Sequence, residues 1–228
     1  MKLKTFLFGS LAGLVLNTFP ALAAPSPNEA LKALTEGNGR YAAGAPIHPN
    51  LDASRRITVA TGQTPFASVL SCSDSHVPVE VLFDQGIGDT FVIRVAGNVS
   101  DTDEIGSIEY GVGHLHTPLL VVLGHTGWGA VKAFLEGAQL HGSLPKLVDN
   151  IAPAVARARK SNLSGPTLSA EAVKWNVWTS IDDVFKNSEE VRNLVKTGKL
   201  TVVGAVYDVE SGKVNWLGGH PEQARLLS

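Results

Sequence analysis

Continuous apolar runs, each bounded by turn residues, recur along the chain. Three of them cover residues 66–70, 91–96 and 119–124, and a fourth covers residues 200–207. Runs that are apolar on both faces are typical of buried strands in a parallel sheet covered by helices. A turn after the fourth run precedes a short strand through Trp216. The pattern therefore predicts four buried strands and a shorter fifth one.

A helical pattern precedes the first strand. Leu31, Leu34 and Tyr41 recur at roughly helical spacing within residues 28–41. This spacing predicts an amphipathic N-terminal helix, with Asn28 as its cap.

Two more helices are predicted at residues 103–114 and 129–139. Strand and helix thus alternate, and no internal repeat or low-complexity linker divides the chain. This order favours an α/β fold with a central, mostly parallel β-sheet flanked by helices and preceded by an N-terminal helical arm.

Side chains able to carry chemistry gather at the ends of predicted strands. Cys72 follows the first strand and His125 follows the third, and Asp74 and His76 come soon after Cys72. In open α/β sheets, ligands bind beyond the carboxyl ends of the strands. We therefore expect a thiol, a carboxylate and two imidazoles around one crevice.

The first residues have the composition of a secretory signal peptide. Lys2 and Lys4 precede an apolar run over residues 6–19, which ends before a small-residue cleavage site. Because a bilayer span takes roughly 20 predominantly apolar residues, this run predicts export rather than a membrane anchor. The expected organisation is a signal peptide at residues 1–23 and a single domain at residues 24–228, periplasmic or secreted, with no membrane span.

Charge and cysteine content narrow the possible functions. The chain has 19 basic and 21 acidic residues, a formal net charge of −2, and no basic cluster that would follow a phosphate backbone. Nucleic acid is therefore not an expected partner. Cys72 is the only cysteine, so no intramolecular disulfide can form, and this thiol either packs inertly or performs chemistry.

Six segments, in order along the chain, resemble successive signatures of the β-class carbonic anhydrases. They are EGNGRYAAG, GQTPFASVLSCSDSHVP, FDQGIGDTFVIRVAGNV, GSIEYGV, LLVVLGHTGWGAV and VVGAVYDVESGKV. Together they span nearly the whole chain after the predicted signal peptide. The resemblance implies a zinc-dependent enzyme that interconverts CO2 and bicarbonate, and that assembles as dimers or higher multiples with active sites at the subunit interface.

The ligand motifs of that family can be followed onto this chain. The resemblance implies that zinc is held by the Cys of C-x-D-x-R and by the His and Cys of H-x-x-C, with water or the Asp in the fourth position. Cys72, Asp74 and His125 match, but Trp128 replaces the second Cys and His76 replaces the Arg. The metal candidates are therefore Cys72, Asp74 and His125, and the catalytic candidates are Asp74 and His76.

Both replacements weaken the expected zinc site. A catalytic zinc needs three protein ligands and an open position, and an indole offers only an N–H donor, so Trp128 cannot coordinate zinc. The family's Arg is implied to pair with the Asp and keep it off the metal. His76 can do this only while protonated, which is a minority state at neutral pH.

Two replacement ligand sets remain open. Asp74 could be a permanent ligand beside Cys72 and His125, or His76 could bend inward and join the same pair. Zinc chemistry tolerates either set.

Three further positions match the family's substrate pocket. Gln63 stands where a glutamine is implied to hydrogen-bond the substrate, and Phe91 and Tyr110 match aromatic residues that line a narrow apolar pocket. Such a pocket suits a small, weakly polar molecule such as CO2. Core or subunit-contact roles for Phe91 and Tyr110 also remain open.

Three functions are compatible with these residues. The first is a β-carbonic anhydrase-like enzyme whose activity is weakened or lost because the zinc site is incomplete. The second is a non-catalytic protein that binds a small molecule on the same fold. The third is a thiol-reactive pseudoenzyme in which Cys72 pairs with His76 or His125.

A homo-oligomer, either a dimer or a tetramer, is also expected. The N-terminal helix around Leu31 and Leu34 resembles the exchanged arm of the family. Without a partner, its apolar stripe would face water.

Overall fold

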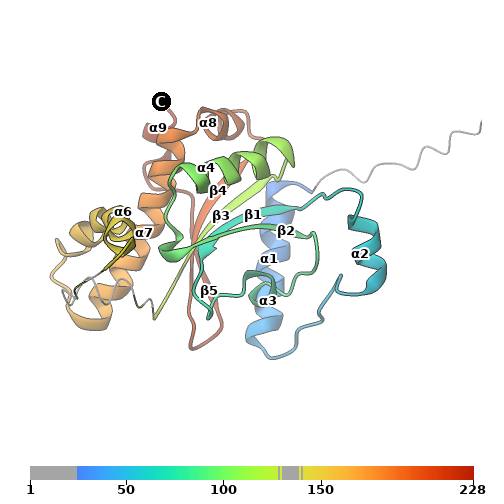
Figure 1. Ribbon diagram of the computed structural model, residues 1–228, viewed down its shortest axis with the longest axis horizontal. Coiled ribbons are helices and arrows are strands. Elements are labelled where there is room, and N and C mark those ends of the chain that lie inside the picture. Colours follow the sequence, from blue (N-terminus) through green and yellow to red (C-terminus); the bar gives the residue numbers. More distant parts are fainter. Residues whose placement is uncertain (1–24, 128, 130–138, 140) are drawn as a thin grey trace, which may run out of the picture.

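The computed structural model describes residues 25–127, 129, 139 and 141–228, which form a five-stranded sheet with helices on both faces (Figure 1). The sheet order is β2-β1-β3-β4-β5; neighbours are parallel except for β5, which runs antiparallel to β4. This confirms the predicted α/β fold with a mostly parallel sheet. The strands are β1 (Ala67–Cys72), β2 (Thr90–Val95), β3 (Leu119–His125), β4 (Thr201–Tyr207) and β5 (Val214–Gly218).

Helices fill the connections between the parallel strands, whereas a turn joins β4 to β5. The predicted helix at residues 103–114 is confirmed, although its last turn, Tyr110–His114, is π-helical. The predicted helix at residues 129–139 lies almost wholly outside the described residues, as does the predicted signal peptide. The α-helices are α1 (Pro27–Ala42), α2 (Ala53–Val59), α3 (Val79–Leu82), α4 (Thr102–Glu109), α6 (Leu144–Ala158), α7 (Gly165–Asn187), α8 (Glu189–Lys196) and α9 (Gln223–Leu226).

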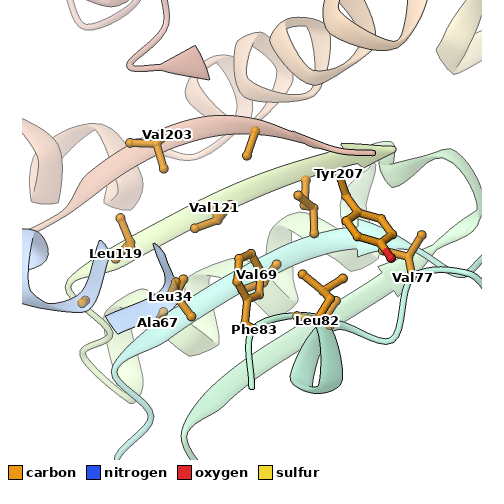
Figure 2. Packing of buried hydrophobic residues seen from close by; sticks show 14 residues of the cluster. Leu34, Ala67, Val69, Val77, Leu82, Phe83, Leu119, Val121, Val203 and Tyr207 are labelled. Carbon is orange, nitrogen blue, oxygen red and sulfur yellow. The ribbon is translucent and has the colours of Figure 1, made fainter. Parts of the chain in front are cut away.

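The central strands bury both of their faces, and their side chains alternate between two cores. Val69 and Val121 face the core shared with α1 and α3, where Figure 2 shows them beside Leu34. Leu70 and Val122 face the opposite core, formed with α4, α7 and α8. This arrangement explains why the strands are continuous apolar runs in the sequence.

The N-terminal helix differs from the expectation in two respects. Its cap is Ser26 rather than Asn28: the Ser26 side chain accepts from the backbone N–H of Glu29, and the Glu29 carboxylate accepts from the backbone N–H of Ser26. Leu34 is fully buried and Leu31 packs on the core of the same chain. The apolar stripe of α1 is therefore covered without a partner subunit, which corrects the reason given for oligomerisation.

Helix α7 lies directly on the sheet because two glycines leave room for it. A Cβ atom added to Gly124 would lie 2.8 Å from a methyl group of Val177, and one added to Gly204 would lie 2.8 Å from the ring of Trp178. Although α7 has 23 residues, neither it nor any other helix in the described part of the chain is long and apolar enough to cross a membrane.

Asp84 holds the end of α1 and the segment that follows it in place through hydrogen bonds. Its fully buried carboxylate accepts hydrogen bonds from Arg40 Nε at 2.6 Å and from the backbone N–H groups of Ile47 and His48 at 3.1 and 2.9 Å. Burial raises the pKa of Asp84, but hydrogen bonds from Arg40 and the two amides outweigh it and hold the pKa below its ordinary value. The ionised carboxylate therefore stabilises the folded chain.

We expect Asp84→Asn to lower the free energy of unfolding by about 2 to 4 kcal/mol at pH 7, because it leaves the partly buried Arg40 without its counter-charge. The contribution of a carboxylate whose pKa is lowered by folding is present above the unfolded-state pKa of about 3.9 and is lost as pH falls through the folded-state pKa. The difference between the two proteins should therefore narrow below about pH 4, as measured by chemical denaturation.

Glu36→Gln is the matched control, since Glu36 forms an exposed pair with Lys32 at 3.7 Å. It should change stability by less than about 0.5 kcal/mol. Equal effects of the two substitutions would contradict the role given to Asp84.

Candidate functional site

The ends of β1 and β3 lie side by side at the centre of the sheet. The chain passes from β1 outward to β2 on one side and from β3 outward to β4 on the other. Ligands of open α/β sheets bind beyond the strand carboxyl ends at such a reversal. Cys72 is the last residue of β1 and His125 is the last residue of β3. The topology thus brings the predicted thiol and imidazole to one edge.

The Cys72 sulfur is buried and receives two backbone hydrogen bonds. Cys72 is only 2% exposed. The N–H of Gly97 donates to Sγ at 3.2 Å and the N–H of Asp74 donates at 3.4 Å. Burial raises the pKa of the Cys72 thiol, but hydrogen bonding with His125 and with the two amides outweighs it, so the pKa lies below its ordinary value. The site therefore stabilises the thiolate form of Cys72 more than water does for an isolated cysteine.

Asp74 is held by its neighbour His76. The backbone N–H of His76 donates to Asp74 Oδ1 at 2.9 Å, and the ring Nδ1 lies 2.7 Å from the same oxygen. The backbone bond of His76 lowers the pKa of Asp74 most; burial opposes it, and the ring of His76 and the charge of His125 add to the lowering. A carboxylate only accepts, so Nδ1 carries the proton.

This geometry corrects one expectation about His76. The neutral tautomer with its proton on Nδ1 already makes the hydrogen bond to Asp74. His76 therefore does not have to be protonated to hold the carboxylate, although the neutral ring lacks the charge of the arginine that it replaces.

Arg94 supports the same loop from β2. Its Nε donates to the carbonyl oxygen of Cys72 at 3.1 Å, and its Nη2 donates to the carbonyl oxygen of Asp74 at 2.6 Å. The guanidinium thus fixes the backbone on either side of Ser73. It contacts backbone oxygens rather than the Asp74 carboxylate, so it does not take over the role implied for the missing arginine.

His125 presents Nε2 to Asp74. Its side chain is 1% exposed, and Nδ1 lies 2.8 Å from the carbonyl oxygen of Thr126, which can only accept. Nε2 lies 4.0 Å from Asp74 Oδ2. Burial lowers the pKa of His125, but the hydrogen bond and charge of Cys72, helped by Thr126 and Asp74, outweigh it and raise the pKa. Cys72 and His125 therefore form a thiol–imidazole pair.

These donors fit a catalytic zinc ion incompletely. Cys72 and His125 are two suitable ligands, whereas Asp74 is already engaged by His76. In the described residues, no group of three or more His, Cys, Asp or Glu side chains is arranged to hold a metal ion. Trp128 lies outside those residues, and its indole has no lone pair to offer zinc. Zinc catalysis requires three protein ligands, and Cys72 and His125 could supply two of them.

The predicted pocket residues lie in two places. The rings of Phe91 and Tyr110 are 5.8 Å apart, and Tyr110 also stacks on His114 at 4.8 Å. Tyr110 is 45% exposed, so it is not a core residue of this chain. Gln63 is exposed in the turn before β1. Their part in a substrate pocket stays a prediction.

Two residues of the site were not among the candidates from sequence. Arg94 and Gly97 belong to the segment that contains β2 and the turn after it. The available signal was the place of the Ala96–Asn98 turn, directly after a strand at the carboxyl edge. Gly97 has φ 81° there, a conformation that side chains with a Cβ rarely adopt.

Comparison with known proteins finds relatives in both sequence and fold. The sequence profile of the carbonic anhydrase family matches residues 67–214. Carbonic anhydrase 2 of Mycobacterium tuberculosis is 39% identical over 192 residues, covering 82% of this chain and 91% of that protein. A carbonic anhydrase of Mycolicibacterium smegmatis is 39% identical over 193 residues, covering 83% and 92%. The crystal structure of a β-carbonic anhydrase from Aspergillus fumigatus is similar with a TM-score of 0.69 at 27% identity, covering 88% of this chain and 94% of that one.

Proposed function

Since the chain belongs to the β-class carbonic anhydrase family, we propose that its reaction is the reversible hydration of CO2 and that this activity is weakened or lost because the zinc site is incomplete. The observation that carries the proposal is the ligand count. Cys72 and His125 meet at the strand ends, and the third position of the family's motif is Trp128. Two ligands fall short of the three that a catalytic zinc needs.

Of the two replacement ligand sets, the one with Asp74 has more support from the geometry. Asp74 Oδ2 lies 4.0 Å from His125 Nε2, so the carboxylate already faces the imidazole. The His76 side chain is 66% exposed, and its Nδ1 is engaged with Asp74. Any residual zinc binding is therefore proposed to use Cys72, His125 and Asp74.

The alternative is a pseudoenzyme on the same fold that binds a small molecule or reacts through its thiol. The contact between Cys72 and His125 favours the thiol-reactive form, because an adjacent imidazole can serve a cysteine nucleophile as its base. The burial of Cys72 restricts such chemistry to small reagents. The rate of alkylation as a function of pH distinguishes a paired thiol from an inert one.

We expect Trp128→Cys to raise both the affinity for zinc and the rate of CO2 hydration, because it restores the third ligand. The double variant Trp128→Cys with His76→Arg should hydrate CO2 roughly 10- to 100-fold faster than the single one, which is the usual cost of losing a residue that orients a ligand. Zinc titration and stopped-flow hydration assays measure the two effects.

Trp216→Cys adds a thiol on β5, away from the strand ends, and is the matched control. It should change neither measure. The proposal is wrong if the unaltered chain hydrates CO2 rapidly and Trp128→Cys makes no difference.

We also propose that the chain forms a homo-oligomer, a dimer or a tetramer, through the region of α2. This short helix has no buried residue. Ile47, Leu51 and Ile57, which lie in this helix or shortly before it, are 66%, 49% and 74% exposed, and several exposed apolar side chains on one segment are usual at subunit contacts.

Light scattering at micromolar concentration should therefore report at least a dimer, and Ile57→Asp should shift it toward the monomer. Leu163→Asp is the control: it changes an exposed apolar side chain elsewhere, in the connection between α6 and α7, and should leave the assembly intact. A monomeric unaltered chain would contradict the proposal.

Export is the third proposal, and it rests on the pattern of residues 1–23. We expect cleavage near Ala23 and Ala24, leaving about 205 residues. Mass spectrometry of protein from the periplasm or the medium of an expressing bacterium should give the cleaved mass. Full-length protein confined to the cytoplasm would refute export.

A further inference from the structure

The Gly97 amide is the closer of the two backbone donors to the Cys72 sulfur. Its N–H lies 3.2 Å from Sγ, against 3.4 Å for the N–H of Asp74. Gly97 sits in a tight turn, with φ 81° and ψ 16°, and is itself buried. This N–H belongs to the Ala96–Gly97 peptide plane, which meets the plane of the Gly97 carbonyl group at the Gly97 Cα atom, so the backbone torsions of Gly97 link the two groups.

A side chain of helix α7 donates a hydrogen bond to the carbonyl group of the same glycine. Asn176 Nδ2 donates to the carbonyl oxygen of Gly97 at 2.8 Å, and Asn176 is 1% exposed. The close packing of α7 on Gly124 and Gly204 brings the helix near enough for this contact. Gly97 is thus held by its carbonyl group from one side, while its N–H points to sulfur on the other.

We propose that Asn176 is a positioning residue that keeps the Gly97 amide directed at the sulfur of Cys72. Fixing the Gly97 carbonyl group restricts rotation of the turn, and the restricted turn keeps the N–H on Sγ. An N–H donor favours the charged form of its acceptor. Any chemistry of Cys72, whether metal ligation or nucleophilic attack, therefore depends on a residue 104 positions further along the chain.

The inference shares Cys72 with the proposed function but does not depend on whether zinc binds. Its test is done on the whole chain with a chelator present. A failure of Trp128→Cys to gain zinc would count against the proposed function alone, whereas the amide measurements below decide the role of Asn176.

The same helix offers a matched control. Ser180 Oγ donates to the carbonyl oxygen of Asn98 at 2.8 Å and is as buried as Asn176. It therefore holds the same turn one peptide group further from the amide that donates to sulfur. Ser180→Ala removes a similar hydrogen bond between α7 and the turn without releasing Gly97.

The experiment follows the Gly97 amide by NMR in four proteins: the unaltered chain, Cys72→Ala, Asn176→Leu and the double variant. In the unaltered background, Cys72→Ala should move the amide proton upfield because the acceptor is lost. In the Asn176→Leu background, that shift should fall to less than about half, and the amide should exchange with solvent about tenfold faster, as expected for a hydrogen bond worth about 1.4 kcal/mol.

Ser180→Ala should leave the response to Cys72→Ala unchanged. An equal response in the Asn176 and Asn176→Leu backgrounds would overturn the proposal, since it would mean that Asn176 only packs. Thermal melts confirm that each variant is folded. If Asn176→Leu does not fold, Asn176→Gln, which keeps the amide on a longer side chain, replaces it and should show an intermediate response.

Discussion

The parallel pairing of β1 with β3 is the constraint on which the rest of the site depends. These two strands are buried on both faces, and Leu70 and Ser71 pair with Val122 and Leu123. A slip of one residue would exchange the two faces and turn apolar side chains toward the wrong helices. The two cores therefore fix the register, and the register fixes how close the Cys72 and His125 side chains come.

Because the two cores hold the strands in register, the chain can keep its fold while one ligand position differs from the motif of the family. Small zinc domains rely on the metal for folding, but here the sheet and its helices bury their own cores on both faces. Cys72 itself packs with Ile151 and Val155 of α6. A tryptophan at position 128 removes a donor from the site without removing any strand of the sheet.

Much of this architecture could be predicted from sequence. Strands that are buried on both faces are continuous apolar runs, and residues at their carboxyl ends could be assigned to one edge. The helix cap, Ser26, lies two residues before the expected Asn28, because both are good capping residues and only the capping box with Glu29 decides between them.

The contacts that orient the site could not be predicted. Arg94 reaches the carbonyl groups of the Cys72 loop from a neighbouring strand, and Asn176 reaches Gly97 across 79 residues of chain. Contacts between residues so far apart in the sequence leave no periodic pattern of apolar and polar residues that could predict them. The exposed apolar side chains around α2 also carry no signal in the sequence. The apolar stripe of α1 is the stronger pattern, but Leu34 of that helix is buried in the core of its own chain.

We propose above all that this member of the family lacks a complete zinc site. The most direct test is elemental analysis of the native protein, purified without added metal and without chelators, with zinc expressed per chain. We expect a zinc content far below one ion per chain, because two suitable ligands and an engaged carboxylate do not retain the metal through purification. About one zinc ion per chain would contradict it and would mean that Asp74 or His76 supplies the third ligand.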